Sequence, residues 1–141
     1  MSIFIDTNVL LLDVMLRRDD FYPTSRAVFD IVETNNINAF VSAVSMTNIF
    51  YILRKFKHNI ADVYSLMDDL SELFTLAPVT ENTITDAMAL RWKDFEDAVQ
   101  FISAQGVNAK YIITRDKTDF ESLEIPCLSP SEYITQFRNN N

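Results

Sequence analysis

Short apolar runs alternate with longer amphipathic stretches along the whole chain, and this alternation constrains the fold more than any other feature. The apolar runs at residues 2–6, 37–41, 74–79, 111–114 and 125–128 have the length of buried strands. Between them, apolar residues recur at helical spacing, as Val63, Leu66, Met67 and Leu70 do. Because strands that are separated by helices usually pair in parallel under helices on both faces, the sequence predicts an α/β fold of three layers, with a central parallel sheet of about five strands flanked by helices.

Capping residues indicate where the helices begin, because Ser, Thr and Asp side chains accept hydrogen bonds from the first free N–H groups of a helix. Helices are expected after Asp6 or Thr7 to residue 16, from Pro23 to about residue 32, after Ser42 or Ser45 into the basic run at 54–57, over residues 60–73, after Thr80 to residue 92, after Asp94 to Gly106 and after Ser129 to residue 137. A glycine such as Gly106 commonly ends a helix. The chain of 141 residues fits one domain, which we place at residues 1–138, with a disordered tail at 139–141.

The rarest residue types exclude most catalytic and binding motifs. The chain has one glycine, one cysteine and one histidine, which are Gly106, Cys127 and His58. A P-loop, a dinucleotide fingerprint, an internal disulfide and a cysteine- or histidine-rich zinc site are therefore excluded. No apolar stretch approaches the ~20 residues that span a membrane, and the N-terminus lacks the basic segment of a signal peptide. We expect a cytoplasmic protein without membrane contact, whose chemistry depends on carboxylates.

Acidic side chains follow two of the predicted strands. Asp6 follows the first and Asp116 the fourth, while Asp97 lies in the first turn of the helix before the fourth. Functional groups collect beyond the carboxyl ends of parallel strands, so these three side chains meet if the two strands are neighbours. Clustered carboxylates repel one another, and a cation removes that repulsion. Because all the ligands are oxygens, we expect Mg²⁺ or Mn²⁺, which would activate water for phosphodiester hydrolysis.

Each acid also has a purely structural interpretation, and the residues alone leave it open. Asp6 is a suitable helix cap. Asp94 and Asp97 have the spacing of a capping box. Asp116 and Asp119 suit an ordinary solvated turn.

Three segments together resemble PIN-domain proteins. They are residues 3–10 (IFIDTNVL), 94–100 (DFEDAVQ) and 113–120 (ITRDKTDF), and the resemblance covers nearly the whole chain. It is strongest to small prokaryotic members, which include the VapC-type toxins of toxin–antitoxin pairs. The resemblance implies a five-stranded parallel sheet with a metal-dependent endoribonuclease site at its carboxyl edge. Its expected products are a 5′-phosphate and a 3′-hydroxyl, and the expected partners are RNA, an antitoxin and a second copy of the chain.

The resemblance also implies a role for individual residues. Asp6, Asp97 and Asp116 would be the catalytic, metal-binding acids. Thr114 would support them by hydrogen bonding, and Asn8 would hold the loop after the first strand. The remaining candidates are Asp119, as a substitute ligand, and Glu96, which faces either the site or solvent.

One position departs from the family pattern. The family usually places an acid early in the helix after the second strand, and here that residue is Asn48. An amide can still ligate a hard cation, but metal affinity should fall because a negative charge is missing. The alternative function is therefore an inactive or weakened scaffold that binds RNA or protein. A receiver or phosphoryl-transfer domain is a third reading, which the absence of a second acid in Asp6-Thr7-Asn8 disfavours.

The net charge opposes RNA binding at long range. The chain has 12 basic and 20 acidic residues and a formal net charge of -8. Salt screens such repulsion within ~8–10 Å, so local cations must assist an RNA substrate. Such residues are also common at solvated helix ends. The candidates are Arg54, Lys55, Lys57, His58, Arg91, Lys93, Arg115 and Lys117.

Overall fold

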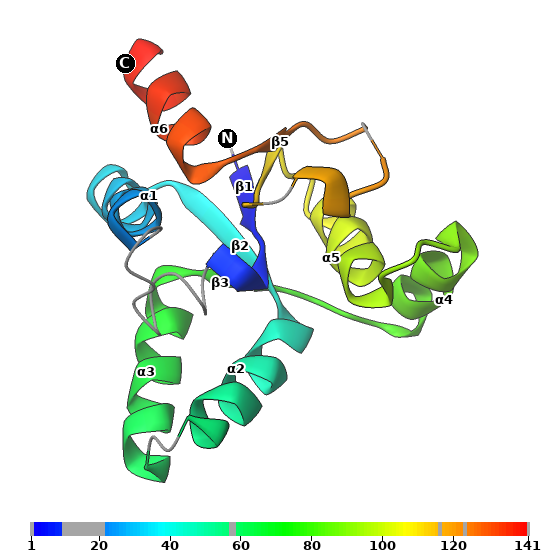
Figure 1. Cartoon of the computed structure of the whole chain (residues 1–141), viewed down its shortest axis with the longest axis horizontal. Coiled ribbons are helices and arrows are strands. Elements are labelled where there is room, and N and C mark those ends of the chain that lie inside the picture. The colour runs from blue at the N-terminus through cyan, green and yellow to red at the C-terminus, as the bar shows by residue number, and fades with distance from the viewer. Residues whose placement is uncertain (1, 10–21, 57–58, 116, 123, 141) are drawn as a thin grey trace.

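The computed structural model describes residues 2–9, 22–56, 59–115, 117–122 and 124–140 of the chain. The strands are β1 (Ser2–Ile5), β2 (Asn38–Ser42), β3 (Thr75–Ala77), β4 (Tyr111–Ile113) and β5 (Cys127–Leu128). The helices are α1 (Tyr22–Asn35), α2 (Ala43–Lys55), α3 (Ile60–Leu73), α4 (Glu81–Leu90), α5 (Phe95–Gly106) and α6 (Pro130–Asn139), as Figure 1 shows. A short 3-10 turn, Lys117–Asp119, follows β4.

All five strands pair in parallel, in the order β3-β2-β1-β4-β5. β1 lies at the centre, where Phe4 is opposite Phe40 of β2 on one side and Ile112 of β4 on the other. The chain leaves β1 toward β2 and returns to β4 on the opposite flank. Such a reversal opens a crevice beyond the carboxyl ends of the two central strands. The predicted α/β fold with a five-stranded parallel sheet is confirmed.

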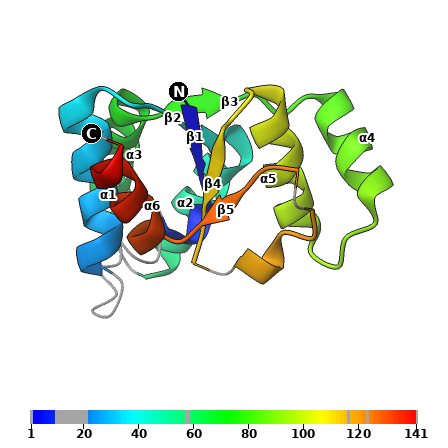
Figure 2. The ribbon, with the colours of Figure 1, turned by 90° about the horizontal axis from the view of Figure 1, so that it is seen from above.

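Successive side chains of β1 point into two different cores, as the pleat of a strand requires. Ile3 and Ile5 belong to the core that α1, α2, α3 and α6 cover, whereas Phe4 packs with Phe101 of α5 and Ile112 of β4. Figure 2 shows the sheet between α1 and α6 on one side and α5 and α4 on the other. These β1 side chains are fully buried, and each contributes about 1.5–3 kcal/mol to the free energy of folding.

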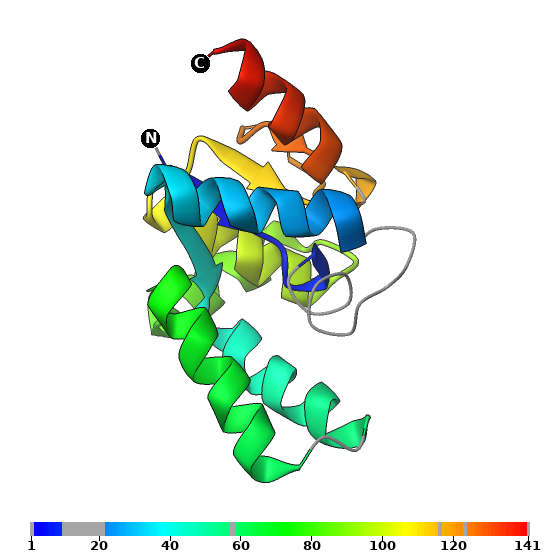
Figure 3. The same cartoon turned by 90° about the vertical axis from the view of Figure 1, so that its left-hand side faces the viewer.

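Helices α2 and α3 form an antiparallel hairpin that projects away from the carboxyl edge of the sheet (Figures 1 and 3). The hairpin carries large exposed apolar side chains, which are Tyr51, Phe56, Ile60 and Tyr64. None of the helices in the described ranges has both the length and the apolar character needed to cross a membrane.

The caps agree with the sequence expectations at most helix starts. Ser42, rather than Ser45, accepts from the first turn of α2, and Thr80, Asp94 and Ser129 cap α4, α5 and α6. Residues 7–9 begin the helix predicted after β1, and its remainder to residue 16 lies outside the described residues.

Some helix ends differ from expectation: α1 continues beyond residue 32 to Asn35, and α4 ends at Leu90 instead of residue 92. α5 does end at Gly106, but the left-handed residue beyond it is Asn108, with φ 55°. Asparagine tolerates this conformation better than most residues, so glycine is not needed there. α6 continues to Asn139, two residues further than predicted.

Candidate functional site

Asp6 is held at the centre of the carboxyl edge of the sheet. Its backbone N–H donates to the carbonyl of Ile113 at 3.0 Å, which extends the β1–β4 pairing by one residue. Its carboxylate Oδ2 accepts a 2.9 Å hydrogen bond from Thr114 Oγ1. Asp6 is only 2% exposed, and Thr114 is fully buried. The structure therefore brings together the first predicted acid and its predicted support.

The second carboxylate oxygen of Asp6 is buried without a hydrogen bond of ordinary geometry from any described residue. Burial raises the pKa of Asp6 above its usual value. The hydrogen bond from Thr114, nearby donors on Gln100 and Asn8, and the charge of Arg115 lower the pKa again, but only in part. A buried acceptor without a partner is costly, so this oxygen is available to a cation.

Asp97 is fixed by the start of α5. Its N–H donates to Oδ1 of Asp94 at 3.1 Å, which is an ordinary N-cap contact. Its own side chain is only 8% exposed, and its Oδ1 lies 3.5 Å from Nε2 of Gln100, which donates to it. The cap belongs to Asp94, so Asp97 is not occupied as the reciprocal partner of a capping box.

A buried chain of hydrogen bonds connects α2, the end of β1 and α5. The backbone N–H of Thr7 donates to Gln100 Oε1 at 3.2 Å, and its hydroxyl is 3.4 Å from the same oxygen. The Thr7 hydroxyl also hydrogen bonds with that of Ser45. Gln100 therefore joins Thr7 to Asp97. Sequence reasoning missed these residues, although Gln100 lies three residues after Asp97 and so on the same helix face.

Asn48 and Glu96 both line a cavity next to the turn that follows β1. The cavity has a volume of about 410 Å³ and is lined by Thr7, Asn8, Asn48, Lys55, Phe56 and Glu96, among others. Partial burial and the negative charges of Asp6 and Asp94 raise the pKa of Glu96. A hydrogen bond from the Asn48 side chain lowers it in part. Glu96 lines this cavity and is also exposed to solvent, so its role in the site stays a prediction.

The remaining predicted acids lie outside the part of the chain that the structure describes. They are Asp116 and the side chain of Asp119, whose backbone closes the 3-10 turn. Within the described residues, no three acidic, histidine or cysteine side chains are arranged to hold a metal ion. The metal role of Asp116 therefore stays a prediction.

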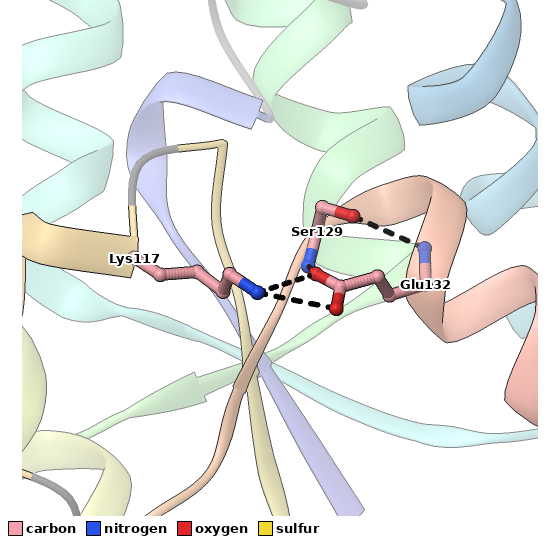
Figure 4. Close-up of polar contacts among 3 residues, drawn as sticks. All are labelled: Lys117, Ser129 and Glu132. Carbon is pink, nitrogen blue, oxygen red and sulfur yellow. Dashed lines mark hydrogen bonds and ion pairs between the residues drawn. The ribbon is translucent and has the colours of Figure 1, made fainter.

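The candidate RNA-binding cations occupy different environments. Lys117 pairs with Glu132, with its Nζ 2.9 Å from Oε1 and 3.1 Å from Oε2, as Figure 4 shows. The backbone N–H of Lys93 donates to Glu121 at 3.0 Å. Arg54 is exposed in the last turn of α2, and Arg115 is close enough to act electrostatically on Asp6. Lys55, one of the predicted cations, lines the same cavity as Thr7 and Asn8, which follow Asp6 in the sequence.

The donor set suits a hard divalent cation. Asp6 offers a buried oxygen without a hydrogen-bond partner among the described residues, and Asp97 offers a carboxylate that accepts a hydrogen bond from Gln100. Oxygen donors without thiolate or imidazole select Mg²⁺ or Mn²⁺ over softer metals.

Comparisons with known proteins give a consistent result. The family model described as PIN domain matches residues 2–118. Ribonuclease VapC1 of Aquifex aeolicus is 25% identical over 143 residues, which cover 96% of this chain and 95% of that protein. VapBC-1 from nontypeable Haemophilus influenzae superposes with a TM-score of 0.70 at 15% identity, over 93% of this chain and 99% of that one. A toxin–antitoxin complex from Klebsiella pneumoniae gives 0.67 at 19% identity, over 92% and 98%. Both solved structures share the fold of this chain.

Proposed function

Because the chain belongs to the PIN-domain family, we propose that it is a metal-dependent endoribonuclease and the toxin of a VapBC-type toxin–antitoxin pair. The observation that carries the proposal is the carboxylate of Asp6. One oxygen is held by Thr114, and the other is buried without a partner among the described residues. Ribonuclease VapC1, similar over almost its whole length, supports RNA as the substrate.

Asp6 and Asp97, with Asp116 from the segment after β4, would hold Mg²⁺ or Mn²⁺. Such an ion lowers the pKa of a bound water and neutralises charge that develops on a phosphate. Thr114 keeps one oxygen of Asp6 fixed, so its other oxygen remains directed and free. Gln100, anchored by the N–H of Thr7, would orient Asp97 through its hydrogen bond to Oδ1.

Substrate approach requires local cations, because the net charge of -8 repels RNA. Lys55 lines the cavity next to the turn after β1, and Arg115 lies within electrostatic reach of Asp6. We assign contacts with the phosphates that flank the cleaved bond to these two residues. Phosphate contacts position a nucleic acid without reading its sequence.

The proposed antitoxin would cover exposed apolar surface on the α2–α3 hairpin. The exposed side chains of Tyr51, Phe56, Ile60 and Tyr64 form an apolar surface of the kind that marks protein contacts. The structural neighbour from Klebsiella pneumoniae is a toxin–antitoxin complex. Co-expression with the product of the neighbouring reading frame, followed by co-purification, tests this partner.

The activity is tested with single-stranded RNA, Mn²⁺ and an EDTA control. Wild-type protein should cleave RNA only with metal, and Asp6→Asn and Asp97→Asn should each reduce the rate by at least about 100-fold. Asp86→Asn, which changes an exposed acid of α4, is the matched control and should retain wild-type activity.

A second measurement separates the nuclease from an inactive scaffold. Saturating Mn²⁺ should raise the unfolding temperature of the wild-type protein, because a ligand that binds only the folded state stabilises it by about 2.7 kcal/mol at 100 times its Kd. Asp97→Asn should abolish the rise. RNA binding without any metal-induced stabilisation or cleavage would instead support the scaffold that Asn48 suggests.

A further inference from the structure

One face of α2 forms a wall of the cavity next to the turn after β1. Asn48 is followed on this face at three, four and seven residues by Tyr51, Ile52 and Lys55, and Phe56 comes at the end of the helix. Because a helix rises about 1.5 Å per residue, Asn48 and Lys55 are about 10 Å apart along it. The cavity volume of about 410 Å³ lies in the range of roughly 300–1,000 Å³ that is usual for ligand sites.

The inner end of this face is tied to the residue that follows Asp6. Ser45 lies about one turn before Asn48, and its hydroxyl hydrogen bonds with the hydroxyl of Thr7. Both side chains are buried, and Thr7 itself lines the cavity. Asn48 is half-buried and Lys55 is exposed. The face therefore runs outward from the turn after Asp6 to the surface.

Two aromatic side chains line this cavity and are largely exposed. Tyr51 is 68% exposed and Phe56 is 60% exposed. Within the described ranges, neither ring packs against another aromatic ring, whereas those of Phe50 and Tyr64 lie 5.5 Å apart between centroids. A nucleobase can stack on an exposed aromatic face, which strengthens binding by about 5- to 100-fold per base.

The polar groups of the cavity suit the other parts of a nucleotide. Lys55, at the outer end, carries a positive charge that can contact a phosphate. The amide of Asn48, at the inner end, can donate to and accept from the edge of a base. Glu96 also lines the cavity and directly precedes Asp97, so its negative charge keeps a phosphate at the Lys55 end.

We propose that this cavity is a nucleotide subsite for single-stranded RNA: a base stacks against Tyr51 and Phe56, and the adjoining phosphate contacts Lys55. The inference rests on the proposed ribonuclease function and deepens it, because it places the bound strand along α2, starting from the turn after Asp6. Stacking accepts any base, so the subsite selects single strands rather than a sequence. Paired bases are stacked within their duplex and cannot make this contact.

The test measures RNA binding in EDTA by fluorescence anisotropy, so that it depends neither on metal nor on cleavage. The probes are a short fluorescein-labelled single strand, the same strand in a duplex, and an abasic strand with the same number of phosphates. The wild-type protein should bind the base-bearing single strand about 5- to 100-fold more tightly than the abasic strand. The duplex should lose the same advantage.

The variants separate the base contact from the phosphate contact. Tyr51→Leu keeps an apolar side chain without a ring and should reduce the preference for the base-bearing strand by at least about fivefold, whereas Tyr51→Phe should retain it. Lys55→Gln should weaken binding of the base-bearing and abasic strands by the same factor. Tyr64→Leu is the matched control, because it changes an exposed tyrosine of the same hairpin that does not line the cavity, and it should bind RNA as wild type.

The outcomes distinguish this inference from the proposed function. If the wild-type protein cleaves RNA with Mn²⁺ but Tyr51→Leu keeps the full preference for bases, the subsite is wrong and the nuclease stands. If RNA is not cleaved but the preference depends on Tyr51, the subsite stands and the nuclease is wrong. If Tyr51→Leu and Tyr64→Leu both lose a co-purified antitoxin and neither changes RNA binding, Tyr51 belongs to the protein contact and the subsite is wrong.

Discussion

Thr114 Oγ1 donates a 2.9 Å hydrogen bond to Oδ2 of Asp6, although 108 residues separate the two in sequence. The contact exists because β1 and β4 are neighbours, so the residues that follow these strands emerge side by side. It satisfies one carboxylate oxygen in a place where the other has no described partner. The hydroxyl therefore fixes the orientation of Asp6 and also stabilises its charge.

Replacing Thr114 with valine should destabilise the protein by about 1–3 kcal/mol at neutral pH, because the shape is kept while a buried charged acceptor loses its donor. The comparison is Thr85→Val, the same change at an exposed position of α4. Urea denaturation in EDTA measures both. An equal loss of unfolding free energy in the two variants would show that the Thr114 hydroxyl does not support Asp6.

Asp6→Asn should stabilise the metal-free protein while it abolishes cleavage. The folded-state pKa of Asp6 is raised, so the stability linked to its protonation is fully present below its ordinary pKa of 3.8 and is lost as the pH rises through the raised value. The neutral amide avoids that loss. The stability of the variant minus that of the wild type should therefore increase from pH 4 upward and then level off.

Denaturation of both proteins in EDTA at a series of pH values measures this difference. A difference that does not change with pH would mean that Asp6 titrates normally. A pH-dependent gain in stability together with lost cleavage is the pattern expected where function requires an unfavourable buried charge.

Local sequence patterns were sufficient to predict the layers of the fold and the N-cap of α5. The alternation of Ile3, Phe4 and Ile5 follows from the strand period, and Asp94 is a cap because its side chain reaches an N–H three residues away. The support of Asp6 by Thr114 was implied by the resemblance to PIN-domain proteins, and the neighbouring positions of β1 and β4 explain the contact. These features depend on short-range geometry or on a general rule of parallel sheets.

The buried polar chain from Ser45 to Gln100 could not be predicted in the same way. Its members come from α2, the end of β1 and α5, and they meet only because three elements pack at one point. Ser45 even appeared as an alternative cap for α2, whereas the structure uses Ser42 and leaves Ser45 for Thr7. Long-range side-chain contacts of this kind have no local signal.

Gln100→Glu should destabilise the protein more than Gln105→Glu, by at least about 1 kcal/mol at neutral pH. Both glutamines lie in α5 and donate to a carboxylate, Gln100 to buried Asp97 and Gln105 to exposed Glu124. The new acid at position 100 keeps an acceptor for Thr7 but faces Asp97 with a second negative charge, and burial strengthens that repulsion.

Gln100→Glu should lose more unfolding free energy than Gln105→Glu, and this difference should shrink as the pH falls and the new acid becomes protonated. Urea denaturation at pH 7 and pH 5 measures the difference. Mn²⁺ should also reduce it, because a cation compensates the added charge. Equal costs for the two variants at both pH values would show that Gln100 does not orient Asp97.

The interaction of Glu132 with the start of α6 should contribute more to stability than its ion pair with Lys117 does (Figure 4). Glu132 Oε1 accepts from the N–H of Ser129 at 3.0 Å, and Ser129 Oγ accepts from the N–H of Glu132 at 3.1 Å, which is a complete capping box. The Lys117 and Glu132 side chains remain 50% and 46% exposed, so solvent screens their attraction and it contributes about 0–1 kcal/mol.

Glu132→Gln retains an acceptor for the cap and loses only the ion pair, whereas Glu132→Ala loses both. The alanine variant should therefore be less stable than the glutamine variant by about 0.5–1.5 kcal/mol.

The backbone hydrogen bond from Ser129, followed by the contact with Lys117, lowers the pKa of Glu132. Its charge-dependent contribution is therefore present above the ordinary pKa and is lost as the pH falls through the lowered value. The difference between wild type and Glu132→Gln should vanish in acid and in 1 M salt, while the alanine variant stays less stable than the glutamine variant. Equal stability of the alanine and glutamine variants at neutral pH would show that the cap adds nothing beyond the ion pair.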